Sequence, residues 1–335
     1  MNIRQMFEER EHELLSPYAA FSDMSRGRAR EEEPCDIRPV YQRDRDRIIH
    51  SKSFRRLKMK TQVFLAPQGD HYRTRLTHTL EVSQNARTIA KALRLNEELT
   101  EAIALGHDLG HTPYGHCGER ALNKLCPDGF THNEQGVRLV DVLEKDGRGM
   151  NLTYEVRDGI LNHQTAGNPS TLEGKIVRLS DKIAYINSDI DDAIRAHILT
   201  PDAIPGCYTD VLGSSLKQRL NTIIHDIILN SEGKNDICMS HDVEEAFLGL
   251  RRFMFEEVYT NPVAKGEEKK AMHVVEQLFE YYMDHVDEMP EEFKVLIENG
   301  TTTERAVCDY IACMTDQYAT NIYKELTIPK TWNIM

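Results

Sequence analysis

The 335-residue sequence predicts an all-α fold. Apolar residues recur at helical intervals along most of the chain, and the clearest case is the isoleucine-rich stripe of 174–195. Between such segments lie short stretches rich in Gly, Pro, Asn and Asp, which are typical of interhelical loops. Alternating patterns are scarce, and 61–67 is the one candidate for a short strand. Few or no strands are therefore expected.

The elements follow one another without an obvious linker. Residues 1–39 predict an N-terminal helix followed by a charged segment, 23–36, whose low apolar content is typical of a mobile connection. Residues 40–200 predict a helical core, beginning with the basic segment and including the amphipathic stretch 77–95. Residues 201–335 predict a helical C-terminal region packed on that core. We expect a single globular unit.

Composition narrows the class of protein. The seven cysteines are odd in number and form no C-x-x-C pair, which indicates reduced thiols in a cytoplasmic protein. No run of 18 apolar residues exists and the start is charged, so neither a membrane helix nor a signal peptide is expected. The net charge of −13 argues against a general nucleic-acid binder.

One basic segment stands out from this acidic background. Residues 42–60 carry eight Lys and Arg against two Asp. Such a concentration of positive charge favours a local anion site, for example for phosphates. The alternative is a helix with a solvated charged face, and the residues alone leave both interpretations open.

The stretch LGHDLGHTPYGHCGE at 105–119 concentrates histidines and acids. Neighbouring residues on a helix diverge by about 100°, so His107 and Asp108 suit a common metal best where a helix ends. The glycines around them make a helix end plausible there. His78 and Asp181 could complete a ligand set, although Asp181 also fits the wet face of an ordinary amphipathic helix.

Several motifs occur in a specific order: RDRDRIIHSKSFRRLKMKTQVF, RTRLTHTLEV, GHDLGHTPYGHCGE, HNEQ and EGKIVRLSDKIAYINSDIDDAI. Over about residues 40–195 they resemble the deoxyguanosinetriphosphate triphosphohydrolase (dGTPase) family of HD-domain metal-dependent phosphohydrolases. The resemblance implies an HD-domain helical bundle with a helical C-terminal extension. It also implies one divalent ion per site, which could be Mg, Mn, Fe, Co, Ni or Zn. Its expected ligands are His78, His107, Asp108 and Asp181.

The resemblance also implies a reaction. A dNTP, with dGTP as the first candidate, would be cleaved at the α-phosphate to deoxynucleoside and tripolyphosphate. His116 and Glu119 are three residues apart and can touch on one helical turn, where the carboxylate fixes the imidazole tautomer. The matching pair in the family is catalytic, and His132 resembles a further active-site histidine. Whether His116 acts as acid or base stays open, and His163 has no comparable indication.

Phosphate contacts are expected from cationic and imidazole side chains. Arg75, three residues before His78, would offer a bidentate fork to a phosphate near the metal, and Lys182, next to Asp181, could hold the outer phosphates. His111 could approach a phosphate or satisfy a loop carbonyl, with equal weight for both. An ion pair with Glu81 is the structural alternative for Arg75.

Sugar recognition is expected from the helix that follows Asp181. The resemblance implies that Tyr185 stacks on the sugar and excludes a ribose 2′-hydroxyl, that Asp189 binds the 3′-hydroxyl, and that Gln62 contacts sugar or base. A core position is the structural alternative for Tyr185.

Partners and competing functions complete the expectations. The resemblance implies a homo-oligomer and allows a dNTP or single-stranded DNA effector, whose site the sequence does not locate. An HD-family nucleotidase or alarmone hydrolase would keep the metal site and change the reaction. A non-catalytic nucleotide-sensing regulator is the alternative from another class.

Overall fold

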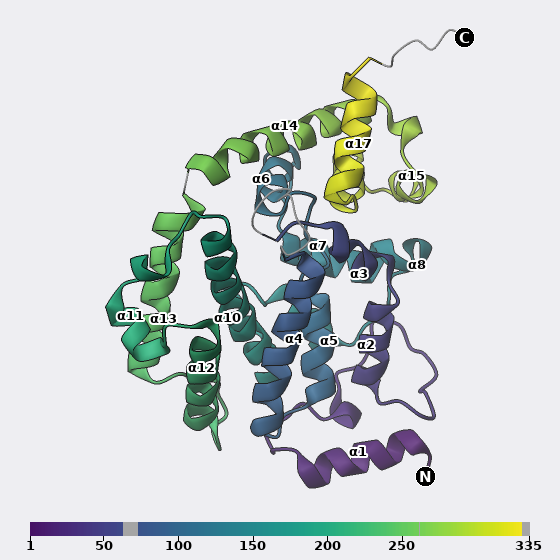
Figure 1. Cartoon of the computed structure of the whole chain (residues 1–335). Coiled ribbons are helices and arrows are strands. Elements are labelled where there is room, and N and C mark those ends of the chain that lie inside the picture. The colour runs from purple at the N-terminus through teal and green to yellow at the C-terminus, as the bar shows by residue number, and fades with distance from the viewer. Residues whose placement is uncertain (63–72, 261, 330–335) are drawn as a thin grey trace, which may run out of the picture.

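A computed structural model describes residues 1–62, 73–260 and 262–329, excluding the side chains of 262–265 (Figure 1). Within these residues the chain is helical and contains no strand, as predicted. Two isolated β-bridges join Arg28 to Thr153 and Thr61 to Thr74. Most of the predicted strand at 61–67 lies outside the described residues. No helix among those described is both long and apolar enough to cross a membrane.

Three helices form the centre of the molecule: α4 (Arg75–Ala92), α5 (Glu97–Gly106) and α10 (Leu172–Arg195). In Figure 1 they lie side by side, and their apolar faces share one hydrophobic core. Local sequence determines where two of them start. The Asn96 side chain accepts hydrogen bonds from the first turn of α5, and Thr171 does the same for α10.

Smaller helices surround this centre. Two of them, α2 (Val40–Ile49) and α9 (Tyr154–Leu161), pack against α5. The others in the first two hundred residues are α1 (Ile3–Leu14), α3 (Lys52–Arg56), α6 (His116–Leu125), α7 (His132–Arg138) and α8 (Glu144–Gly147). Both α6 and α7 begin with a histidine, so each of these helices presents an imidazole at its first residue.

The C-terminal helices fall into two sets. Beside α10 lie α11 (Gly206–Leu212), α12 (Leu216–Ser231) and α13 (His241–Met254), and a π-helical turn, Phe255–Tyr259, follows α13. The long α14 (Pro262–Asp284) then crosses to the other end of the molecule (Figure 1). There it packs with α6, α15 (Glu291–Glu298), α16 (Thr303–Ala312) and α17 (Asp316–Thr327) around a second hydrophobic core.

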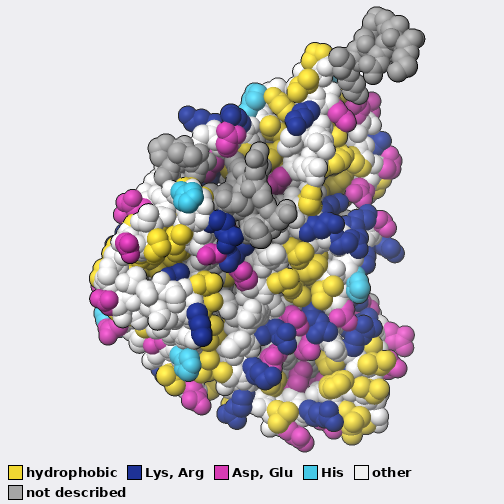
Figure 2. All heavy atoms as spheres, in the orientation of Figure 1, with side chains coloured by type: hydrophobic (Ala, Val, Ile, Leu, Met, Phe, Trp, Pro, Cys, Tyr) yellow, Lys and Arg dark blue, Asp and Glu magenta, His cyan; other side chains and the backbone are white. Residues whose placement is uncertain are grey.

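The three arginines on α2, in the first part of the basic segment, form ion pairs within the chain. Arg43 and Arg47 contact Glu32 at 3.3 and 2.7 Å, and Arg45 contacts Glu98 at 2.6 Å. Figure 2 shows Lys and Arg side chains gathered over the region of α2 and α3. The first part of the basic segment therefore holds α2 in place, while exposed cations remain on α3.

Candidate active site

Three residues from three helices converge between α4, α5 and α10. His78, His107 and Asp181 each offer one ligand atom, and these atoms lie within 4.8 Å of one another. His78 Nε2 is 3.0 Å from Asp181 Oδ1, and His107 Nε2 is 3.8 Å from the same oxygen. His107 caps the C-terminus of α5, which places its ring at a helix end. We call these three residues the His107 group.

The His107 group has the donor chemistry that a divalent ion requires. His107 Nδ1 donates to the Ala104 carbonyl at 2.6 Å, which leaves a lone pair on Nε2. That Nε2 is buried and has no hydrogen-bond partner among the described residues. Burial opposes ionisation of Asp181, but the hydrogen bond from His78 and the nearby His107 lower the pKa of its carboxyl to about 2. Imidazole nitrogens beside an ionised carboxylate suit a borderline divalent ion.

Asp108 lies at the edge of this group. Its Oδ1 is 3.4 Å from His107 Nε2, and its Oδ2 accepts a hydrogen bond from Arg75 at 3.0 Å. Arg75 is almost fully buried, and it is Arg73 that pairs with Glu81, at 2.9 Å. The guanidinium of Arg75 therefore orients Asp108, and the Glu81 alternative is not what the structure shows.

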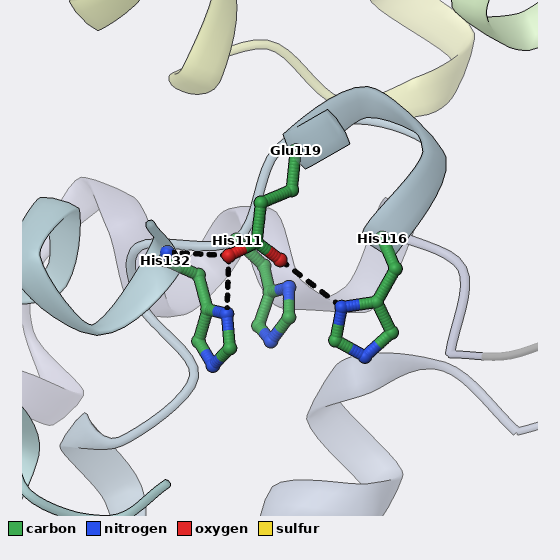
Figure 3. A group of neighbouring side chains, drawn as sticks. All are labelled: His111, His116, Glu119 and His132. Atoms are coloured by element: carbon green, nitrogen blue, oxygen red, sulfur yellow. Dashed lines mark hydrogen bonds and ion pairs between the residues drawn. The ribbon is translucent and has the colours of Figure 1, made fainter. Parts of the chain in front are cut away.

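A second cluster lies next to the first. His111, His116, Glu119 and His132, here called the Glu119 cluster, bring one ligand atom each within 4.8 Å of the others (Figure 3). The two carboxylate oxygens of Glu119 lie 3.0 Å from His116 Nδ1 and 2.9 Å from His132 Nδ1. The His111 ring stacks on His132 with centroids 3.9 Å apart. Burial opposes ionisation of Glu119, but hydrogen bonds from His116 and His132 hold its pKa well below the usual range.

His163 joins this site, although no motif in the sequence assigned it a role. Its Nδ1 donates to the Ile160 carbonyl at 2.6 Å, and its Nε2 lies 3.1 Å from His132 Nε2. The ring is buried, and burial with the nearby His107 and His132 lowers its pKa to about 3. A local signal exists: like His107, His163 follows a helix and bonds the carbonyl three residues earlier.

The predicted sugar-binding pair on α10 meets the C-terminal region. The Tyr185 hydroxyl accepts a hydrogen bond from Arg251 Nε at 2.8 Å. Asp189 is buried and accepts a hydrogen bond from the Tyr259 hydroxyl. Burial raises the pKa of Asp189 to about 7, although the hydrogen bond from Tyr259 acts in the opposite direction. Arg251 and Tyr259 belong to α13 and the turn after it, where the sequence offered no motif.

Lys182 stands in a cationic neighbourhood. Its side chain is half-buried, and burial together with the charges of Arg178 and Arg251 lowers its pKa. Asp181 is the acid that opposes this effect. Three positive groups near one potential metal ligand form a suitable environment for a polyphosphate.

The loop before α6 is fixed by residues from the far end of the chain. Asp316 accepts hydrogen bonds from the backbone N–H groups of Thr61 and Tyr114, both at 2.9 Å. Buried Lys60 donates to the carbonyl of His111 and, at 2.8 Å, to that of Ala312. The ends of α16 and α17 thus help to hold the loop that carries His111 and leads to His116.

The loop also takes an unusual backbone path. Tyr114 and Gly115 have φ angles of 62° and 58°, in the left-handed region. A Cβ at Gly115 would lie 3.1 Å from Arg75 Nη2. The Gln62 carbonyl is 3.4 Å from the same Nη2, and the Gln62 side-chain oxygen is buried without a hydrogen-bond partner in the described part of the chain. Gln62 therefore borders the site, while its neighbours 63–72 lie outside the described residues.

A buried ionic network anchors α7, whose first residue is His132. Asp309 on α16 is fully buried and accepts hydrogen bonds from Arg138 Nε at 2.7 Å and Gln135 Nε2 at 3.0 Å. Arg305, one turn before Asp309, approaches the same carboxylate at 3.2 Å. The C-terminal region thus holds the helix that carries one histidine of the Glu119 cluster.

Comparison with known proteins shows which families the chain matches. The HD domain family matches residues 75–186, and the family described as phosphohydrolase-associated domain matches 237–325. A deoxyguanosinetriphosphate triphosphohydrolase-like protein of Caldanaerobacter subterraneus subsp. tengcongensis is 62% identical over 99% of this chain and 98% of its own. One of Clostridium perfringens strain SM101 is 51% identical over 98% and 99%.

A solved structure shares the fold. The chain is similar to a phosphohydrolase from Bacteroides thetaiotaomicron VPI-5482 with a TM-score of 0.53 at 18% identity. The similarity covers 84% of this chain and 68% of that one.

Proposed function

The chain belongs to the deoxyguanosinetriphosphate triphosphohydrolase-like family of HD phosphohydrolases, and from this premise we propose that it hydrolyses dNTPs to deoxynucleoside and tripolyphosphate. We propose dGTP as the first substrate to test. The observation that carries the proposal is the adjacency of two groups. The His107 group can hold a divalent ion, and the Glu119 cluster beside it can move protons.

The two groups have separate tasks in this proposal. A divalent ion held by His78, His107, Asp181 and the neighbouring Asp108 would polarise an α-phosphate oxygen and activate a water. Glu119 binds Nδ1 of His116, so the other ring nitrogen is free to exchange a proton with the reacting groups. The His116 side chain is 66% exposed, which gives substrate and water access to it.

Substrate binding is assigned to the face of α10 and the residues that meet it. Lys182, with Arg178 and Arg251 nearby, would bind the triphosphate. Tyr185 would lie against the sugar at C2′, where a ribose hydroxyl would be excluded. Asp189 would accept a hydrogen bond from the 3′-hydroxyl.

Product identification tests the proposal. The purified chain would be incubated with each dNTP and with GTP, alone and in pairs, with Mn²⁺ or Mg²⁺, and the products separated by anion exchange. Deoxynucleoside with intact tripolyphosphate is the expected result, and pairs of nucleotides would reveal an effector. Monophosphate or diphosphate products would instead favour a nucleotidase, and faster cleavage of an alarmone would favour the alarmone hydrolase. No product in any combination would favour a nucleotide sensor.

A further inference from the structure

The hydrogen bonds behind His132 determine where its lone pair points. His163 donates from Nδ1 to the Ile160 carbonyl, so the Nε2 of a neutral His163 carries a lone pair. This Nε2 faces His132 Nε2 at 3.1 Å, and His132 must therefore supply the hydrogen. A neutral His132 then presents the lone pair of its Nδ1 to Glu119 Oε1, 2.9 Å away. Two electron-rich atoms in such contact need a cation between them, which is a proton when His132 is an imidazolium and a metal ion when its Nδ1 is deprotonated.

His111 also directs one ring nitrogen, without a hydrogen atom, toward Glu119. Its Nε2 is 3.2 Å from Asp108 Oδ1, so the ring directs its N–H toward that carboxylate. Its Nδ1 is buried and has no hydrogen-bond partner within the described residues. Figure 3 shows this nitrogen on the side of the ring that faces Glu119. His111 is 2% exposed, so water does not readily satisfy it.

The converging atoms have the spacing and chemistry of a cation site. One atom from each of the four residues of the Glu119 cluster lies within 4.8 Å of the others. A tetrahedral zinc site with bonds of about 2.0–2.1 Å has ligand-to-ligand edges of roughly 3.3–3.4 Å. The 2.9 and 3.0 Å contacts run from His132 and His116 to different oxygens of Glu119, so the rings must move outward and the carboxylate must rotate to bring one oxygen to that spacing from both.

We propose that the Glu119 cluster is a second divalent-cation site, separate from the one formed by the His107 group. Three imidazoles and one carboxylate favour Zn²⁺, Co²⁺ or Ni²⁺ over the oxygen-seeking Mg²⁺. The exposed ring of His116 gives the ion a route from solvent. Asp108 lies between the two sites, 3.4 Å from His107 Nε2 and 3.2 Å from His111 Nε2.

Occupancy of this site would regulate turnover, a consequence that rests on the proposed function. An ion bound to Glu119 and to Nδ1 of His116 takes the place of the proton that the pair shares. Hydrolysis of dGTP should therefore rise as Co²⁺ fills the His107 group and fall as further Co²⁺ fills the Glu119 cluster. The expected profile is a maximum in activity against Co²⁺ concentration.

Metal stoichiometry tests the site without any assay of turnover. The full-length chain, stripped of metal by a chelator, would be titrated with Co²⁺ and followed by visible absorption and elemental analysis. We expect two Co²⁺ per wild-type chain, one in Glu119→Gln, and one in Asp181→Asn. His50→Ala, which removes an exposed histidine at the end of α2, is the matched control and should keep two.

Two further variants protect the test against misfolding. His116→Ala changes an exposed side chain and should lose the second Co²⁺ while its melting temperature stays at the wild-type value. His163→Ala removes the hydrogen-bond acceptor behind His132 and should lower the affinity for the second Co²⁺ by about 10- to 100-fold. Excess Mg²⁺ should not displace the second ion.

The outcomes separate this site from the proposed function. The second site is overturned if the wild-type chain binds one Co²⁺. It is also overturned if wild type binds two Co²⁺ and both Glu119→Gln and His116→Ala still bind two. A chain that binds two Co²⁺ in the expected pattern but releases no tripolyphosphate supports the site, and only the proposed function then fails. Tripolyphosphate release by a chain that binds a single Co²⁺ overturns the second site and leaves the proposed function in place.

Discussion

Replacing Asp309 by Asn tests how the C-terminal region supports the site. The substitution keeps the shape of the side chain and removes a fully buried negative charge that Arg138 and Arg305 approach from α7 and α16. Breaking a buried ion pair costs about 3–5 kcal/mol. The two arginine side chains are 24% and 18% exposed, so partial solvation reduces the expected loss to about 2–3 kcal/mol.

The loss should appear both in stability and in turnover. Urea unfolding followed by circular dichroism measures the free energy of unfolding of Asp309→Asn against wild type. Because α7 begins with His132, a small shift of this helix should also lower kcat for dGTP, by about 10- to 100-fold. Glu298→Gln, at an exposed acid on α15, is the control and should change neither quantity. A loss of stability below about 1 kcal/mol with unchanged kcat would refute the anchoring role of Asp309.

Three further predictions follow from the pKa shifts and contacts. Burial lowers the pKa of Lys60 to about 8, so between pH 8 and 10.5 the unfolded chain binds a proton that the folded chain does not. The free energy of unfolding of wild type should therefore rise by about 3 kcal/mol relative to Lys60→Met over this pH range, as measured by denaturation at each pH. A difference that does not change with pH would contradict this. Tyr185→Ala should raise the rate of GTP cleavage relative to dGTP, and unchanged discrimination would make Tyr185 a packing residue. Tyr259→Phe removes a hydrogen bond that lowers the pKa of Asp189, so the acidic limb of the pH profile of kcat/KM should move from near pH 7 to higher pH. An acidic limb that does not move would show that Asp189 does not take part in substrate binding.

Those features of the fold and site that depend on local sequence patterns can be predicted from the sequence. The helical class follows from apolar spacing, and the HD motif identifies residues at the end of α5 because glycines and adjacent ligands mark that end. His163 shows the limit of this reasoning. It has the same bond to a carbonyl three residues earlier as His107, yet only the packing of α9 brings it to His132.

Residues from the C-terminal region were beyond sequence reasoning for a different reason. Arg251, Tyr259 and Asp309 contact partners that lie 66, 70 and 171 positions earlier in the chain. Contacts of this range depend on how helices pack against one another, and neither periodicity nor spacing specifies that packing.

The bonds from Asp316 have a consequence for how the protein is made. This residue fixes Thr61, which is 255 positions earlier, and Tyr114, which is 202 positions earlier. Ribosomes deliver a chain from its N-terminus, so His78, His107 and Asp181 emerge long before the helix that secures the neighbouring loop. A nascent chain that ends before α17 would carry every residue of the His107 group without the Asp316 bonds that fix the loop before α6. Competence to handle protons would then arise only when nearly the whole polypeptide has been released.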